Sequence, residues 1–297
     1  MADAAPSGRQ RPPVSAVITT FNEEHNIGDC LASLEWCDEI VVLDSYSTDR
    51  TPEVARAHPK VRFFQRPYYG SASAKNWATD QTRFDWILIF DADERCTPQL
   101  QAEMERELLA PRAEVYVIKR RVYFMDRVIR FSGWQRDRVV RLFRRGAARY
   151  PNKRVHADMV TRSKSLVFRH PMLHFMIERF DEYVPRVVKY GVWGAAQAWR
   201  RGRTTNGVEV LLRPLWRFAR MYIFQLGFLD GAAGVVFCVL QAFATYTKWA
   251  TLWAWRHDAK RGRMPVLPAF DEKEETWDFR AEDGPGDAAA APGVNGG

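Results

Sequence analysis

The chain has only four cysteines among its 297 residues, and their spacing matches neither a metal site nor a redox pair. Cys30, Cys37, Cys96 and Cys238 are scattered, so we expect reduced thiols in a cytosolic environment. The N-terminus, residues 1–13, is polar and lacks the apolar core of a signal peptide. These absences predict that the folded part of the chain faces the cytoplasm.

Three further absences exclude whole classes of protein. No Gly-x-Gly-x-x-Gly turn follows the first apolar run at 14–20, which argues against a dinucleotide-binding oxidoreductase. No known nucleic-acid-binding motif is present, so we expect no nucleic-acid partner. There is no internal repeat, and with 46% hydrophobic and 27% charged residues the composition is that of a globular protein.

Acidic residues are scarce between Lys119 and Arg154, where only Asp126 and Asp137 oppose a long series of arginines and lysines. The chain as a whole carries a formal net charge of +8. Such a block indicates an anionic partner, which could be a substrate phosphate, an anionic lipid headgroup or a nucleic acid. The alternative is a solvated basic face.

Short β-branched runs alternate with helical stretches in the first half of the chain. The alternation is typical of a mostly parallel sheet covered by helices on both faces. We predict strands over 14–20, 39–43, 61–65 and 86–90 and helices over 23–34, 51–57 and 71–82. Ligands of such sheets bind beyond the carboxyl ends of the strands. The polar residues that follow each run are therefore the candidate site.

The pattern changes after residue 113. Strand-like pieces at 114–124, 139–143 and 166–168 predict antiparallel strands and loops at the edge of the sheet. After Glu178 the pattern is helical to about Trp255, and the tail from residue 257 is polar and predicted to be disordered. We therefore divide the chain into a disordered N-terminus (1–13), a sheet domain (14–170), a helical membrane-associating region (171–256) and a polar tail (257–297).

The helical region has two segments that point to a membrane. In Pro214–Leu229, Pro214 suits a first helical position, and arginines lie beside a broad apolar and aromatic surface. Gly231–Thr247 carries no charge and is followed by Lys248 and clustered tryptophans. We expect interfacial or re-entrant membrane contact here, and the alternative is a buried helical hairpin.

Acidic and polar side chains follow three of the predicted strands. Asp91 and Asp93 come directly after a fully apolar run, where two carboxylates can hold a hard divalent cation such as Mg²⁺ or Mn²⁺. Asp44 ends another strand and could accept a hydrogen bond from a base or a ribose. Asn22 and Glu23 follow the first strand, where they could equally cap the next helix. For Asp49 and Thr51 we favour a capping role.

The order of these motifs is more specific than any one of them. Thr-x-Asn-Glu-Glu, then Val-Val-x-Asp-Ser-x-Ser-x-Asp-x-Thr, then Asp-Ala-Asp-Glu resembles the nucleotide-sugar domain of family-2 glycosyltransferases, above all the branch that glucosylates lipopolysaccharide core. The resemblance extends over residues 14–255. Further matching features are Lys75-Asn76, Trp134 to Asp137, Arg138 to Arg145, Val155-His156, His174 and Gly227 to Gly231.

This resemblance implies a GT-A-like, mostly parallel (Rossmann-like) α/β sheet with flanking helices, and an inverting, metal-dependent transfer of a hexose. The donor would be a nucleotide-diphosphate sugar, with uridine as the expected base. Thr20, Asn22, Glu23 and Asp44 would line the nucleotide pocket, and Asp91 and Asp93 would meet the ribose, metal and diphosphate. The supplementary cations for the diphosphate would be Lys75, Arg138 and Arg141.

An inverting displacement also needs a carboxylate base near the acceptor hydroxyl. The related pattern reads Val-His-Glu, whereas this chain has Val155-His156-Ala157-Asp158. The candidate bases are therefore Asp158 and Asp137, and the alternative for Asp137 is a structural ion pair.

The resemblance predicts a lipid-linked or glycan acceptor and a location at the cytoplasmic face of the bacterial inner membrane, either peripheral or through a short C-terminal segment. Two other activities stay open. One is glycosylation of polyprenyl phosphate, an anionic acceptor that needs no base. The other is basic nucleic-acid or membrane binding without catalysis.

Overall fold

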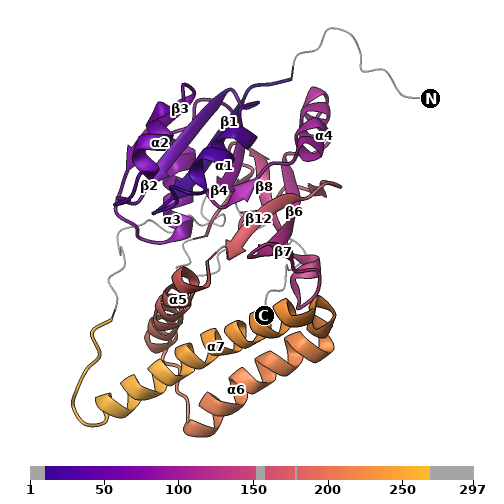
Figure 1. Ribbon diagram of the computed structural model, residues 1–297. Helices are drawn as coiled ribbons and strands as arrows, with labels where there is room; N and C mark the ends of the chain where they lie inside the picture. The colour runs from indigo at the N-terminus through magenta and orange to yellow at the C-terminus, as the bar shows by residue number, and fades with distance from the viewer. Residues whose placement is uncertain (1–10, 152–157, 178, 268–297) are drawn as a thin grey trace. The chain divides into compact units, whose positions relative to one another are not determined.

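The computed structural model describes residues 11–151, 158–177 and 179–267, and the chain divides into two compact units. Unit 1 contains residues 11–120 and 138–174, and unit 2 contains residues 121–137 and 175–267. Most of the two ends that the sequence predicts to be disordered lies outside the described residues. Figure 1 shows the course of the chain from the N-terminal sheet to the C-terminal helices.

Unit 1 is built on four parallel strands in the order β3-β2-β1-β4. The strands are β1 (Val14–Thr20), β2 (Glu39–Asp44), β3 (Val61–Gln65) and β4 (Trp86–Asp91). The helices between them are α1 (Ile27–Ser33), α2 (Thr51–Ala57) and α3 (Ser71–Asp80). Each of these seven elements was predicted, so the α/β class with a mostly parallel sheet is confirmed.

Neighbouring residues of each strand point to opposite faces of the sheet, and a hydrophobic cluster covers each face. Ala16 and Ile18 pack in one hydrophobic cluster with Ile27, Cys30 and Leu31 of α1. On the other face, Val17 and Val41 pack with the alanines of α3. Strands covered on both faces read as continuous apolar runs, which is why the sequence located them so well.

Helix α1 is shorter at its N-terminus than the predicted stretch from Glu23. Its N-cap is Asn26, since the preceding residues form a turn whose backbone bonds to the α2 loop. The backbone N–H of Glu23 donates to Thr51 Oγ1, and that of Glu24 donates to Asp49 Oδ2. The residues predicted as the first helical turn therefore form a loop that is hydrogen-bonded to the loop before α2.

Antiparallel strands extend the sheet, as the sequence predicts for 114–124 and 139–143. β8 (Arg138–Arg144) pairs antiparallel with β4, and β6 (Val115–Phe124) pairs antiparallel with β8. The third predicted piece is β11 (Ser165–Val167), which runs parallel to β6, so its antiparallel assignment was wrong. The remaining strands are β5 (Glu94–Arg95), β9 (Ala148–Arg149), β10 (Val160–Thr161) and β12 (Met172–Ile177).

Helix α4 (Pro98–Leu109) was left unassigned by the sequence analysis, although the signals for it are present. The Thr97 side chain accepts a hydrogen bond from the Leu100 N–H at the N-cap, and Pro98 occupies the first turn. Leu100, Met104 and Leu108 recur every four residues and are fully buried. This periodicity identifies the buried face of the helix.

Unit 2 is mainly helical, which confirms the predicted helical pattern after Glu178. It contains β7 (Arg127–Val128), the 3-10 turns at Trp134–Arg136 and Gly227–Asp230, and a π-helical turn at Arg220–Phe224. Its long helices are α5 (Phe180–Arg200), α6 (Gly207–Ala219) and α7 (Gly231–Ala259). Residues Gly227–Ala259 form one stretch long and apolar enough to cross a membrane, by length and composition only.

Pro214 lies inside α6 and not at its first position, so that prediction was wrong. Helix α6 begins at Gly207, where the Asn206 side chain accepts a hydrogen bond from the Glu209 N–H. A favourable N-cap eight residues earlier thus sets the start of the helix, and the chain continues through the proline. The π-helical turn follows directly and joins α6 to the glycine-rich segment before α7.

Candidate functional site

The carboxyl ends of three parallel strands meet at one edge of the unit 1 sheet. Thr20 is in register with Asp44 on one side, and Thr19 is in register with Asp91 on the other. The polar residues that the sequence places after these strands are therefore brought together. This is the edge where ligands of parallel sheets bind.

Asn22 and Glu23 fasten the first two loops of this edge to each other. The Asn22 backbone has a φ of 53°, its N–H donates to Ser47 Oγ, and its side-chain oxygen accepts from the Thr48 N–H. Glu23 accepts from the Asn26 side chain at 2.9 Å. Asn22 is thus not the N-cap of α1, and both residues preorganise the loop expected to hold a nucleotide.

Asp44 is completely buried at the end of β2 and already accepts three hydrogen bonds. The donors are the Ser47 N–H, the Ser47 hydroxyl and the Gln65 side-chain amide. A carboxylate has about four acceptor positions, so these bonds fill three of them. Asp49 accepts from the Thr51 N–H at the start of α2, although the N-cap residue is Arg50. Thr51 is the first residue of the helix, and its hydroxyl accepts from the Glu23 N–H, so it is not a cap.

Asp91 is held between two buried cations. Lys75 Nζ lies 2.7 Å from one carboxylate oxygen, and Arg141 Nη2 lies 2.8 Å from the other. Burial alone would raise the pKa of Asp91, but Lys75 and Arg141 together hold that pKa well below its usual value. Burial alone would lower the pKa of Lys75, but the attraction of Asp91 outweighs burial, so the pKa of Lys75 is raised. Asp91 and Lys75 are therefore charged at neutral pH.

Glu94 completes this network, and sequence reasoning gave it no role. It is fully buried, its Oε1 lies 2.5 Å from Arg141 Nη2, and its Oε2 accepts from the Asp91 N–H. Arg120 approaches the same carboxylate at 3.8 Å. The signal for Glu94 is its place directly after the Asp-x-Asp triplet at the start of β5, where a buried carboxylate must find cations.

Asp93 is paired with His174, which arrives on β12. His174 Nε2 lies 3.4 Å from Asp93 Oδ2, and β12 pairs with β5 so that His174 is opposite Glu94. Burial lowers the pKa of His174, but Asp93 more than offsets it and the pKa is raised. A carboxylate and an imidazole are both suitable ligands for a divalent transition metal.

A metal ion would have to complete its coordination with other groups. Among the residues that the structure describes, no three His, Cys, Asp or Glu side chains form a ready metal site. Asp91 is engaged by Lys75 and Arg141, whereas Asp93 is paired with His174. The predicted metal ligands Asp91 and Asp93 thus differ in how far they are occupied.

Three buried polar atoms at this edge have no hydrogen-bond partner within the described chain. They are Thr20 Oγ1, Arg141 Nε and His174 Nδ1. Leaving a buried polar atom unsatisfied costs about 1–3 kcal/mol, so native proteins seldom keep such atoms without use. Thr20 lies opposite Asp44, Arg141 contacts Asp91 and His174 lies opposite Glu94, so all three belong to residues that contact or pair with the acidic side chains of this edge.

The remaining predicted site residues are Arg138, Asp137 and Asp158. Arg138 is exposed at the start of β8, and Asp158 is exposed before β10. Asp137 belongs to unit 2, where its backbone N–H closes the turn at Trp134–Arg136. Val155 and His156, which the resemblance included, lie outside the described residues. The structure therefore brings Lys75, Asp91 and Arg141 into contact and does not select a base.

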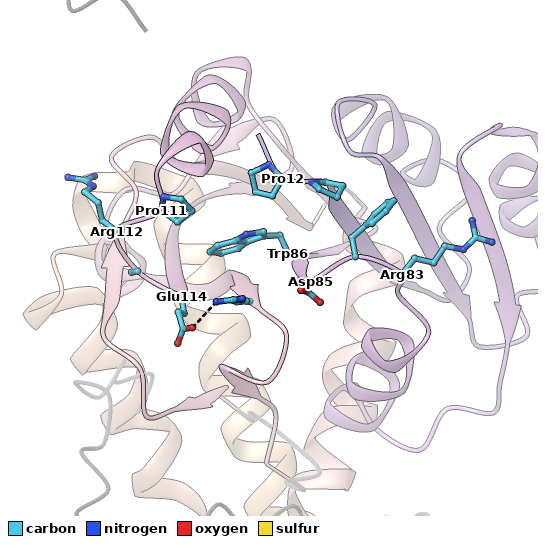
Figure 2. Close-up of a pocket in the computed structure, with 11 residues that line it drawn as sticks. Pro12, Arg83, Asp85, Trp86, Pro111, Arg112 and Glu114 are labelled. Atoms are coloured by element: carbon cyan, nitrogen blue, oxygen red, sulfur yellow. Dashed lines mark ion pairs between the residues drawn. The ribbon is translucent and has the colours of Figure 1, made fainter. Parts of the chain in front are cut away.

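A hollow of about 700 Å³ lies at the opposite end of β4 from these carboxylates. It is lined by residues that precede β1 and β4, and Figure 2 shows Trp86 between Pro12, Pro111 and Glu114. Trp86 is the first residue of β4 and Asp91 the last, which separates the hollow from the acidic edge by about 16 Å of strand. It contains none of the predicted site residues.

Several known proteins are similar to this chain in sequence. The family described as "Glycosyl transferase family 2" matches residues 15–201. The lipopolysaccharide core biosynthesis glycosyltransferase LpsC of Rhizobium meliloti is 32% identical over 253 residues, which are 80% of this chain and 93% of that protein. An uncharacterized glycosyltransferase of Rickettsia typhi is 24% identical over 80% of this chain and 86% of its own length.

Among solved structures, glucosyl-3-phosphoglycerate synthase from Mycobacterium tuberculosis, in complex with Mn²⁺, UDP and glucosyl-3-phosphoglycerate, is 25% identical with a TM-score of 0.32. That match covers 38% of this chain and 44% of the synthase, so it spans less than half of either. The family match, by contrast, runs from β1 through α5 and includes every strand of the acidic edge. This chain belongs to glycosyltransferase family 2.

Proposed function

We propose that this glycosyltransferase moves a hexose from a UDP-sugar, with inversion and with the help of a divalent cation, to a lipid-linked or glycan acceptor at the cytoplasmic face of the bacterial inner membrane. The observation that carries the proposal is the acidic edge of the unit 1 sheet. There Asp91 is kept ionised by Lys75 and Arg141, and Asp93 lies beside it with His174.

The charge balance of this edge supports a role for the cation. Three cationic side chains, Lys75, Arg120 and Arg141, contact the carboxylates Asp91 and Glu94, and Asp93 adds a third carboxylate. The formal charges of these six side chains cancel, so the only further positive charge among the groups named here is a protonated His174 beside Asp93. A divalent cation held by Asp93 and His174 would stabilise the negative charge that grows on the departing diphosphate.

The chain's own residues would bind and orient the donor. Asn22 and Glu23 fix the loop after β1, so its shape is set before the nucleotide arrives. Asp44 can accept one further hydrogen bond, which suits a ribose hydroxyl or a uracil N–H. The unpartnered Thr20 hydroxyl and Arg141 Nε offer donors to the ribose or a phosphate oxygen.

The acceptor is proposed from the relatives and from unit 2. LpsC is named for lipopolysaccharide core biosynthesis, and the match covers almost its whole length. An acceptor of that kind is anchored in a membrane, and unit 2 exposes many large apolar side chains beside arginines. We therefore assign this chain to lipopolysaccharide core or another cell-envelope glycan.

The acceptor hydroxyl must lose a proton during an inverting displacement, and Asp137 and Asp158 remain the two proposed bases. We expect Asn at the correct position to remove the acidic limb of the kcat/KM profile and to lower kcat by about 100-fold or more. The other Asn variant should keep the limb. If neither variant changes it, both assignments fail.

Calorimetry with a panel of UDP- and GDP-sugars, with and without Mn²⁺, tests the donor. We expect Mn²⁺-dependent binding of one UDP-sugar, which Asp93→Ala should abolish without unfolding the protein. The matched control is Asp85→Ala, since Asp85 is an exposed acid before the other end of β4. Unchanged Mn²⁺-dependent binding by Asp93→Ala would remove the metal assignment, and no binding by folded wild type would remove the donor assignment.

A further inference from the structure

Helix α6 carries a stripe of large apolar side chains that the fold leaves uncovered. Val208, Leu211, Leu212, Leu215 and Trp216 are 55–65% exposed, and they recur at spacings of three and one. Ile223 and Phe224 in the π-helical turn are equally exposed. Isolated exposed apolar residues are ordinary, but a continuous stripe along one helix marks an interaction surface.

Helix α7 has a second exposed stripe, while its opposite side is buried. Val236, Val239, Phe243, Tyr246 and Trp253 are 39–51% exposed and follow one helical face. The buried side includes Phe237, Cys238, Leu240 and Leu252. Helix α7 is therefore covered by protein along one side and presents an uncovered apolar face along the other.

Helix α7 also packs along two charged neighbours. Trp199 of α5 contacts Trp255, and a Cβ on Gly191 would meet Thr247, so α5 and α7 run parallel. Arg213 of α6 lies over the Trp249 ring at 4.0 Å, and Figure 1 shows α6 and α7 side by side. If α7 crossed a bilayer, α5 and α6 would have to enter the bilayer with it. Each charged side chain of α5 and α6 placed there would cost free energy.

The end of unit 2 where α5 and α7 finish is rich in arginine and tryptophan. Arg256 donates to the backbone oxygens of Trp199 and Arg203 and lies 4.0 Å over the Trp199 ring. Exposed cations surround this point: Arg200, Arg201, Arg203, Lys260, Arg261 and Arg263. Tryptophans beside arginines and lysines are the usual composition at the headgroup level of a membrane.

We propose that α6 and α7 form a docking surface that lies in the headgroup region of an anionic membrane without crossing it. The apolar stripes reach the acyl boundary, and the arginine-rich end meets anionic headgroups. This inference deepens the proposed function and rests on it only for the choice of leaflet. The cations favour anionic lipid over a second copy of the chain, whose own arginines would repel them.

Flotation of the purified full chain with vesicles tests the surface, because it needs neither donor nor acceptor. We expect binding to phosphatidylcholine mixed with phosphatidylglycerol, and at least about tenfold weaker binding by Leu212→Glu/Leu215→Glu. The matched control is Val167→Glu, an exposed valine on β11. A second variant, Arg201→Gln/Arg203→Gln, should lose the preference for phosphatidylglycerol while keeping the apolar stripe.

Two outcomes would overturn the docking surface. One is unchanged flotation of both the glutamate and the glutamine variants. The other is a wild-type dimer without vesicle binding that Leu212→Glu/Leu215→Glu converts to monomer by light scattering, which would make the stripe an interface between copies. Calorimetric donor binding in the same variants reports separately on the proposed function, since it measures unit 1.

Labelling with a membrane-impermeant maleimide tests whether α7 crosses. All four native cysteines are buried, so an introduced thiol can be followed. Ala232→Cys and Lys260→Cys place one exposed thiol near each end of α7. We expect neither to be labelled in spheroplasts and Lys260→Cys to be labelled in inverted membrane vesicles. Labelling of either one in spheroplasts would show a spanning helix and overturn the proposal.

Discussion

Lys75 and Asp91 are opposite charges, of which the fold buries the lysine and leaves the aspartate 30% exposed. The Lys75 side chain is only 7% exposed, and its amino group contacts both oxygens of Asp91. Lys75→Met should lower the free energy of unfolding by about 2 kcal/mol, because Asp91 keeps Arg141 but loses its second cation. Urea titration measures the change.

The control for this substitution is Lys60→Met, which removes a lysine from an exposed ion pair with Glu35. Exposed pairs are worth less than about 1 kcal/mol, so this variant should unfold close to wild type. Equal effects of the two substitutions would mean that burial adds nothing to the Lys75–Asp91 pair.

The stability of the fold should depend on pH through Glu39, at the start of β2. Burial raises its pKa, but hydrogen bonds from the Arg83 N–H, Ser15 and Arg62 outweigh burial, so the folded-state pKa lies below the ordinary 4.5. The ionised carboxylate thus stabilises the fold above that pH, and this contribution is lost as the pH falls through the lowered pKa.

The stability gap between wild type and Glu39→Gln is therefore expected to be about 1–3 kcal/mol at pH 7 and to shrink below pH ~4.5. Urea unfolding of both proteins across that range measures it. A gap that stays constant with pH would show that the loss comes from packing and not from the charge.

Asp91 could be assigned to the candidate site from the sequence, whereas His174 could not. Asp91 follows a fully apolar run, so its place at a strand end is a local property that a pattern reveals. His174 reaches Asp93 only because β12 pairs with β5, and that pairing joins distant segments. Single-sequence patterns contain no signal for such pairings, which is why the histidine was quoted and given no role.

At the scale of elements, the entry into α7 depends on close backbone contact. A Cβ on Gly234 would clash with the Gly227 carbonyl and lie 2.9 Å from Asp230 Cβ. Gly234→Ala should therefore lower the free energy of unfolding by about 1–3 kcal/mol, since a backbone atom cannot give way as a side chain can. Thermal unfolding followed by circular dichroism measures it.

Gly207→Ala is the matched control, because Gly207 is also helical and a Cβ there meets nothing within 4 Å. That variant should be neutral or more stable by up to about 1 kcal/mol. If Gly234→Ala behaves like Gly207→Ala, the contact with Gly227 is not a constraint.

Element boundaries were predictable where burial alone decides them and not where loops interact. β1, α2 and β3 have the predicted limits. β1 is a buried apolar run, and Pro52 stands in the first turn of α2. The limits of α1 and α6 differ, because Thr51 draws the Glu23 N–H into a turn and Asn206 caps α6 well before Pro214. Both outcomes depend on side chains that a periodic pattern does not weigh.

At the scale of the whole molecule, cation and donor should stabilise the chain only together. Lys75, Arg120 and Arg141 already contact Asp91 and Glu94, and His174 contacts Asp93, so the protein is expected to stay folded in a chelator. At about 100 times its dissociation constant a donor adds ~2.7 kcal/mol, which corresponds to a Tm rise of about 5 °C. Scanning calorimetry with UDP-sugar, Mn²⁺ and EDTA measures this.

An equal Tm rise in EDTA would contradict metal dependence. A rise with Mn²⁺ alone, at low metal concentration, would instead indicate that Asp93 and His174 bind the ion without the diphosphate.

The two units are not successive pieces of chain, because residues 121–137 belong with the helices that follow residue 174. Asp230 accepts hydrogen bonds from the backbone of Arg130 and Phe131, which precede it by 100 and 99 residues. During synthesis the segment that carries Asp137 therefore leaves the ribosome long before its partner exists. The surroundings of that candidate base can therefore be completed only after Asp230 and the helix that follows it have been synthesised.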